Sequence, residues 1–311
     1  VWADTYTLGH ERSDFGDNMW MMVPVVVTAY EAGGAATIVD RATSPIEIDA
    51  NLLDKARGRV KKDKYRMILL EPPPYSFGGA GSPGKPAGAA PGEPAGVGPG
   101  QGGAEALTNA VKEGLAECME LYTEKPPAGS AQNFGFKGYR RWAELLTKPK
   151  GAGTWAATFT DGRRLHAALS TAYTYALLYC KGDEKDAERG LFADFLDEAV
   201  DGAGRAAELF REAGALWSGL GDVLLPATVS LLGRTRETLE RRHKLFREAG
   251  ASPELETIDS ELDGLREQAA EGLGGAADHG EILTAAAEVV REICSTEEAA
   301  IEELSALPLE I

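Results

Sequence analysis

The sequence contains few of the residues from which catalytic and metal sites are most often built. Its 311 residues include 3 cysteines and 4 histidines. Cys118, Cys180 and Cys294 are widely separated, odd in number, and each lies among apolar residues of a helix-like segment. This spacing is typical of reduced core thiols and argues against a disulfide framework or a zinc site. We therefore expect no metal and no cofactor.

Positive charge is also scarce. The chain has 32 Lys and Arg against 49 Asp and Glu, a formal net charge of −17 at pH 7. Proteins that bind nucleic acid or anionic membranes use clusters of Lys and Arg to neutralise phosphates, so this composition argues against both partners. One basic stretch runs from Lys55 to Arg66 and includes Lys61 and Lys62. Such a run is usually a solvated helix face.

Long apolar runs are missing as well. No run reaches the length of about 20 residues that spans a membrane, and no basic-then-apolar leader precedes the first predicted strand, so we expect a cytoplasmic protein. Gly, Pro and Ala dominate residues 76–103. Such a segment cannot offset the entropy lost in ordering it, which predicts a flexible linker. The linker separates a β-rich domain at 1–75 from a helical domain at 104–311.

Alternating and β-branched residues predict the elements of the first domain. They are strands at Val1–Leu8, Trp20–Tyr30, Thr37–Asp40 and Tyr65–Leu70, and a helix from Asn51 to about Lys61 capped by Asp49. The valine-rich second strand is expected to be central and buried on both faces, and Gly33-Gly34 should turn it into a hairpin with the third. Because the chain begins within an apolar strand that has no earlier partner, we expect further sequence upstream of Val1.

Helical periodicity dominates after Ala104. Leu107, Val111, Leu115, Cys118 and Tyr122 recur at spacings of three and four residues, which predicts one apolar helix stripe. Similar stripes cover residues 165–179, 192–200 and 209–220, and two long helices are expected at about 229–249 and 281–306. The predicted fold class is α+β, a partial antiparallel β domain followed by an all-α helical bundle.

Several segments resemble the butirosin biosynthesis protein H family. In the first domain they are residues 1–6, 27–31 and 38–41, and in the second they are residues 133–136, 141–146 and 189–199. The resemblance covers nearly the whole chain apart from the Gly/Pro-rich tract. It implies a papain-like N-terminal domain, of which this chain holds the C-terminal part, and a helical domain of unknown function.

The resemblance also implies acyl transfer from a thioester donor, an acyl carrier protein, to a small amine acceptor. A cysteine thiolate attacks the thioester, an imidazole moves the proton and a carboxylate orients the imidazole. The family pattern His-x-Val-Val-Val-x-Gly-Tyr matches residues 23–30, where Val23 replaces the histidine and Ala29 the glycine. Asp40 matches the orienting carboxylate. The segment that carries the cysteine would lie upstream of Val1.

Other residues are weaker candidates for this site. His10 is a candidate base, although a histidine in a loop is more often merely solvated. Tyr6, Trp20 and Tyr30 are candidate cleft residues, although aromatic residues in strands more often belong to the core. Lys61 and Lys62, from the basic stretch, are candidate contacts for the acidic carrier protein.

Two functional hypotheses follow. The first is an acyltransferase-like enzyme of secondary metabolism, which the family resemblance favours. The second is a non-catalytic binding or scaffold protein that retains the papain-like shell. Val23 favours the second hypothesis, because a valine cannot accept a proton and general-base catalysis typically contributes a factor of about 10² to 10⁴ in rate.

Overall fold

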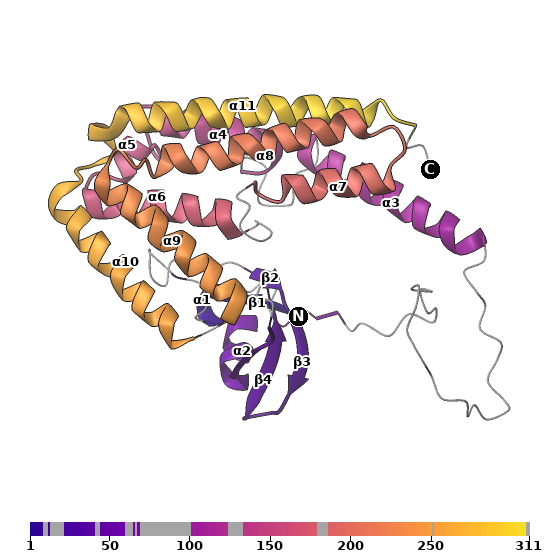
Figure 1. Ribbon diagram of the computed structural model, residues 1–311, viewed down its shortest axis with the longest axis horizontal. Helices are drawn as coiled ribbons and strands as arrows, with labels where there is room; N and C mark the ends of the chain where they lie inside the picture. Colours follow the sequence, from indigo (N-terminus) through magenta and orange to yellow (C-terminus); the bar gives the residue numbers. More distant parts are fainter. Residues whose placement is uncertain are drawn as a thin grey trace.

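The computed structural model describes residues 1–8, 12, 22–40, 44–59, 65, 67–68, 101–123, 133–178, 186–250 and 252–308. Most described residues are helical, and the others include two small antiparallel sheets. This combination confirms the α+β class. Most of the helices form an elongated bundle, and the strands lie beside the ends of α9 (Ser230–Ala249) and α10 (Pro253–Gly272) (Figure 1). No described helix is both long enough and apolar enough to cross a membrane.

The described strands form two separate antiparallel sheets. The first pairs β1 (Trp2–Asp4) with β2 (Met22–Pro24), and the second has the order β3 (Val26–Tyr30), β4 (Ala35–Val39), β5 (Ile46–Asp49). The hairpin predicted at Gly33-Gly34 is confirmed by the antiparallel pairing of β3 with β4. Gly33 has φ +73°, a left-handed conformation that glycine adopts without strain.

Two predicted strands of the first domain were wrong in part. The first strand ends at Asp4, and the short helix α1 (Thr5–Leu8) follows, where the Thr7 hydroxyl donates a hydrogen bond to the Asp4 carboxylate at 2.6 Å. The second predicted strand divides at Val25, whose amide and carbonyl pair with Val1 at 2.8 Å each. Its second half, β3, is an edge strand with mostly exposed residues, and β4 takes the central position.

The start of the helix predicted after Asp49 is confirmed by α2 (Ala50–Arg57), which ends at Arg57 and so is shorter than the predicted helix. The Asp49 side chain accepts a hydrogen bond from the amide of Asn51 at 2.7 Å, as an N-cap does. A strand was predicted at Tyr65–Leu70, of which the structure describes Tyr65, Met67 and Ile68. All three are exposed and lie outside any strand, so this prediction was wrong. Residues 76–100 of the predicted linker lie outside the described residues.

The helical part contains the stripes that periodicity predicts, except that Phe195, expected in the stripe at 192–200, is exposed. Its remaining elements are α3 (Gln101–Thr123), α4 (Gly135–Thr147), α5 (Trp155–Thr158), α6 (Gly162–Leu178), α7 (Arg189–Ala199), α8 (Gly204–Leu224), the 3-10 helix η2 (Ala276–His279) and α11 (Gly280–Ser305). The long helices expected at 229–249 and 281–306 are α9 and α11. Sequence reasoning missed α10, although Pro253 in its first turn and Glu254 and Glu256 beside it are helix-start signals.

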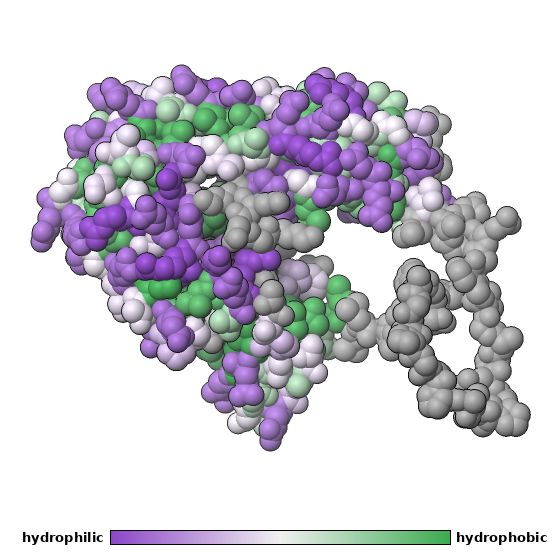
Figure 2. Space-filling view, in the orientation of Figure 1, coloured by the Kyte–Doolittle hydropathy of each residue, from purple (hydrophilic) through white to green (hydrophobic). Residues whose placement is uncertain are grey.

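The bundle is organised around α11, which packs along α8 and α4. One apolar core joins α11 to α6, α8, α9 and α10, with Leu220, Val290 and Ile293 fully buried in it. A second core lies between α7, α8 and α11 and includes Leu196 and Phe210. Hydrophilic side chains cover much of the face of the bundle that Figure 2 shows.

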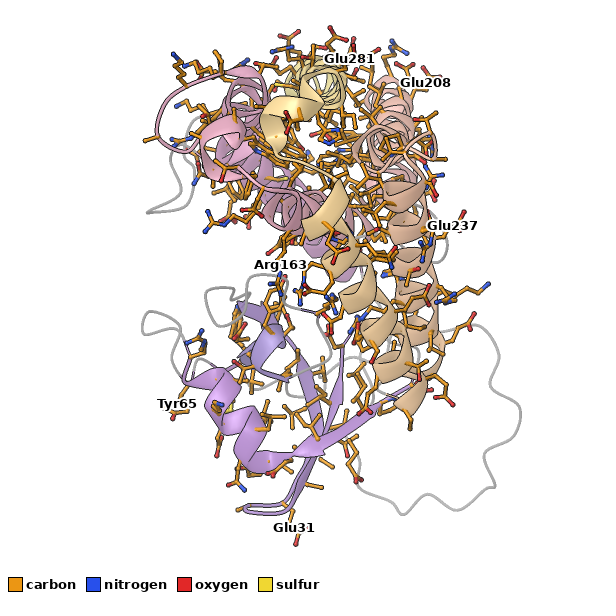
Figure 3. The ribbon with its side chains drawn as sticks, turned by 90° about the vertical axis from the view of Figure 1, so that its left-hand side faces the viewer. Glu31, Tyr65, Arg163, Glu208, Glu237 and Glu281 are labelled. Carbon is orange, nitrogen blue, oxygen red and sulfur yellow. The ribbon has the colours of Figure 1, made fainter. Side chains whose placement is uncertain are left out.

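The β part is attached to the ends of α9 and α10. Phe246 and Leu255 from these helices belong to the same apolar core as Ile46 and Leu53 of the β part. A polar contact adds to this core, because the Arg12 guanidinium donates to the Asp259 carbonyl at 3.1 Å and to the Asp263 carboxylate at 2.8 Å. Glu31, beside the β3–β4 turn, lies at the end of the molecule remote from the bundle (Figure 3).

A histidine lies inside the bundle between α6 and α9. His166 is 2% exposed, and its Nε2 lies 2.8 Å from the Thr235 hydroxyl oxygen. Because the Thr235 hydroxyl donates to the Leu231 carbonyl, His166 must be the donor in this bond, which leaves Nδ1 without a proton. Nδ1 is buried and has no hydrogen-bond partner among the described residues. Burial, with smaller contributions from Arg12 and Arg266, lowers the pKa of His166 to about 4.

We predict that His166 makes the bundle sensitive to acid. An unfolded histidine binds a proton near pH 6.5, whereas folded His166 binds one near pH 4, so stability is lost as pH falls through this window. The shift corresponds to about 3 kcal/mol. Urea denaturation from pH 7 to 4 should show His166→Gln losing less stability than the wild type. An equal effect of His279→Gln would contradict the assignment to His166.

Candidate functional site

Several sequence candidates cannot be placed. His10, Trp20, Lys61, Lys62 and Cys180 lie outside the described residues. The candidate base and the candidate contacts for a carrier protein therefore remain predictions from the sequence.

Val23 and Asp40, the two positions matched to the family site, are both partly buried in the β part. Val23 lies opposite Ala3 in the β1–β2 ladder, whereas Asp40 follows β4 in the other sheet. Tyr6 is partly buried on α1. Tyr30 is 49% exposed and donates from its hydroxyl to the Asp54 carboxylate of α2 at 3.3 Å. Neither tyrosine nor Asp40 lines any of three cavities among the described residues, of about 500, 490 and 590 Å³.

The described cysteines have the properties of core thiols. Cys294 is 4% exposed, and burial raises the pKa of its thiol to about 11. Burial also raises the pKa of Cys118 on α3. A nucleophilic cysteine requires the opposite shift, because the thiolate is the reactive form. The described residues also contain no group of three or more His, Cys, Asp or Glu that is placed to hold a metal ion.

The most distinctive site is a cavity of about 500 Å³ between α4, α5, α6 and α8, which we call the tryptophan cavity. Its walls carry five aromatic side chains: Trp142, Trp155, Phe159, Tyr175 and Trp217. Ala168, Ala172 and Ala176 of α6 line it as well and leave its interior open. This size and lining are typical of a pocket for a small organic ligand.

The turn before α7 forms part of the wall of the tryptophan cavity. Ala187, Glu188 and Arg189 line the cavity, and the first two have φ values of +53° and +61°, which non-glycine residues rarely adopt. The Asp186 carboxylate holds the turn, because it accepts the amides of Glu188 at 2.9 Å and Gly190 at 2.8 Å. Strained backbone of this kind is common at functional sites.

A glycine of α8 allows this turn to lie close to the bundle. A Cβ atom at Gly214 would lie 3.0 Å from Cβ of Asp186 and 3.3 Å from Cβ of Arg189. Any side chain at this position would therefore push the turn away from α8. The glycine thus fixes where Arg189 enters the bundle.

Arg189 and Glu297 form a buried ion pair beside the cavity. Nε of Arg189 donates to Glu297 at 2.7 Å, and the Glu297 side chain is fully buried whereas that of Arg189 is 19% exposed. Nη2 of Arg189 lies 3.0 Å from the hydroxyl oxygens of both Tyr122 and Tyr139, and the Trp217 indole donates to Glu297 at 3.3 Å. We call these five residues the arginine–glutamate cluster.

The guanidinium of Arg189 is held firmly in its charged state. Burial acts to lower the pKa of Arg189, but the carboxylate of Glu297 and the side chains of Tyr122 and Tyr139 together outweigh it, so that the pKa is raised. Burial and the same carboxylate raise the pKa of Tyr139 well above its ordinary value. Tyr122 and Tyr139 also line a second cavity of about 490 Å³, which shares Trp142 with the tryptophan cavity. The cluster therefore forms part of the wall of both cavities.

Sequence reasoning did not identify this site, although a signal was present. Arg189 lies three, four and seven residues before Phe192, Ala193 and Leu196, on the buried stripe of α7. Glu297 occupies the buried stripe of α11 in the same way, between Ile293 and Ile301. A charge on a buried stripe requires an opposite charge nearby, so the two positions together predict an ion pair.

No family model, curated protein or solved structure matches the chain. The function must therefore be inferred from the chemistry of the site itself.

We predict that Glu297→Ala destabilises the bundle strongly. The change leaves the Arg189 charge buried without its partner, which typically costs about 3 to 5 kcal/mol of unfolding free energy. Urea denaturation at pH 7 measures the loss. The double variant Arg189→Met with Glu297→Leu should lose less, because it removes both charges.

A matched control for this prediction is the exposed pair of Arg211 with Asp194, at 2.7 Å. Asp194→Ala should change the unfolding free energy by less than about 1 kcal/mol, as expected for a solvated ion pair. Equal losses in Asp194→Ala and Glu297→Ala would show that the buried pair has no special role.

Proposed function

We propose that this chain is a non-catalytic binding protein that takes up a small aromatic molecule in the tryptophan cavity. The observation that carries the proposal is the gathering of three tryptophans, a tyrosine and a phenylalanine around one cavity of about 500 Å³. This proposal adopts the second of the two hypotheses drawn from the sequence, the non-catalytic binding or scaffold protein. In this proposal the β part keeps a papain-like shell and the protein acts in the cytoplasm.

The physical basis of the proposal is the apolar surface that a ligand covers. An aromatic ring that moves from water into such a cavity gains about 1.5 to 3 kcal/mol from burial. Tilted and edge-on contacts between rings add to this, and the Trp155 and Phe159 rings already meet in this way at 5.0 Å and 73°. The ligand therefore replaces water with ring contacts on several sides.

The rigidity of the walls supports the same proposal. Trp155 is 8% exposed and Ala176 is 6% exposed, so both belong to the buried framework of the bundle. The Trp217 indole is held by its hydrogen bond to Glu297. Side chains that are fixed before binding lose little entropy when a ligand arrives, which favours affinity.

Acyl transfer from a carrier protein to an amine stays a prediction from the family resemblance. It needs a thiolate and an imidazole, and burial raises the pKa of both described cysteines while Val23 stands at the expected histidine. These observations favour binding over catalysis. A thiol-directed acyl probe should not label this chain, and labelling at a cysteine would favour the enzyme instead.

We predict that 2-phenylethanol binds in the tryptophan cavity. This neutral probe does not absorb at 295 nm, so titration with excitation at that wavelength should change the tryptophan emission and saturate. Ala172→Phe places a ring inside the cavity and should weaken binding at least about tenfold, because overfilled sites exclude ligands.

The matched control is Ala199→Phe, at an exposed position at the end of α7 outside the cavity. It should bind 2-phenylethanol as the wild type does. An unchanged emission in the wild type, or equal binding by both variants, would contradict the proposed site.

A further inference from the structure

The tryptophan cavity is larger than one aromatic ring requires. Its volume is about 500 Å³. An apolar protein cavity of about 150 Å³ is enough to hold one benzene molecule. The tryptophan cavity is therefore about three times as large as the space that a single ring needs. A ligand with one ring would leave much of the wall uncovered.

Helix α6 contributes a long wall to this cavity. Five of its residues line the cavity: Ala168, Thr171, Ala172, Tyr175 and Ala176. Residues at these spacings of three and four lie along one face of a helix, here over two turns. At a rise of about 1.5 Å per residue, the wall is about 12 Å long.

The alanines keep this wall low. Ala168, Ala172 and Ala176 follow one another at intervals of four residues, so their methyl groups form a row along α6. We call this row the alanine row. A methyl group is the shortest side chain after the hydrogen of glycine, so a ligand can approach the helix closely along the whole row.

Broad rings line the cavity from other helices. Trp142 belongs to α4, Trp155 to α5 and Trp217 to α8. Aromatic rings pair most favourably when they are stacked with an offset or meet edge to face. A ligand that contacts both these indoles and the alanine row covers the most surface when it is itself flat and long.

We propose that the tryptophan cavity binds a flat aromatic compound whose two or more rings are fused into one plane. The long axis of the ligand lies along the alanine row, and its rings meet the indoles of Trp142, Trp155 and Trp217. This inference rests on the proposed function, since it names the ligand class of the same cavity. Each further ring that fits the cavity removes more apolar surface from water and so strengthens binding.

The test compares three neutral alcohols: 2-phenylethanol, (3-benzylphenyl)methanol and fluorene-2-methanol. The first has one benzene ring, and the second has two that rotate independently. The third differs from the second only in the bond that joins the two rings and holds them in one plane. Equilibrium dialysis against the full chain measures the bound fraction of each compound.

We expect fluorene-2-methanol to bind at least about tenfold more tightly than either of the other two alcohols. It buries more apolar surface than a single ring, and it loses no internal rotation on binding, whereas (3-benzylphenyl)methanol does. This comparison uses the unaltered chain, so it does not depend on the folding of any variant.

A variant tests the position of the ligand along α6. Ala172 is the middle residue of the alanine row and is partly exposed. Ala172→Leu should weaken fluorene-2-methanol by about tenfold, because the larger side chain interrupts the row, and 2-phenylethanol by less than about threefold, because one ring fits beside it. Ala199→Leu, at an exposed position of α7 outside the cavity, is the matched control and should bind both compounds as the wild type does.

The outcomes separate this inference from the proposed function. If 2-phenylethanol binds and is blocked by Ala172→Phe, but fluorene-2-methanol binds no more tightly, the aromatic site stands and the fused-ring ligand is wrong. If fluorene-2-methanol and (3-benzylphenyl)methanol bind equally, the requirement for a flat ligand is wrong. Equal weakening of fluorene-2-methanol and 2-phenylethanol by Ala172→Leu would overturn the placement along the alanine row. If none of the three compounds binds, both proposals fail.

Discussion

The buried ion pair of Arg189 and Glu297 is the constraint on which the helical part depends. Its partners Tyr122, Tyr139 and Trp217 come from α3, α4 and α8, so the cluster joins five helices at one point. A charge that is out of contact with water cannot move away from its partner without a large free-energy cost. Apolar cores tolerate small rotations of helices, whereas this network fixes how α7 and α11 meet. The positions of both cavities follow from it.

The same network contributes side chains to the walls of both cavities of the bundle. Arg189 faces the tryptophan cavity, whereas the two tyrosines line the second cavity, and Trp142 belongs to both walls. The cluster therefore adds the charged side chain of Arg189 to the wall of the tryptophan cavity. The two described cysteines lie in the opposite kind of environment, because burial raises the pKa of both thiols. Both shifts support the proposal of a binding protein over that of a cysteine-dependent enzyme.

The sequence predicts local structure well and the site poorly, for physical reasons. Helical periodicity is a local property, so the stripes of α3, α8 and α11 could be read from spacings of three and four residues. The exposure of β3 depends on which strand pairs beside it, and spacing along the chain does not contain that information. The tryptophan cavity is assembled from α4, α5, α6, α8 and the turn before α7, so no single motif marks it. The paired charges on two buried stripes were the one available signal.

Gly214 has a consequence for the kinetics of the site. Because the turn of residues 186–189 rests directly against α8 at this glycine, this part of the cavity wall is packed onto the bundle. For the proposed ligand, this part of the wall is in place before binding, so differences in affinity between ligands are expected mainly as differences in residence time.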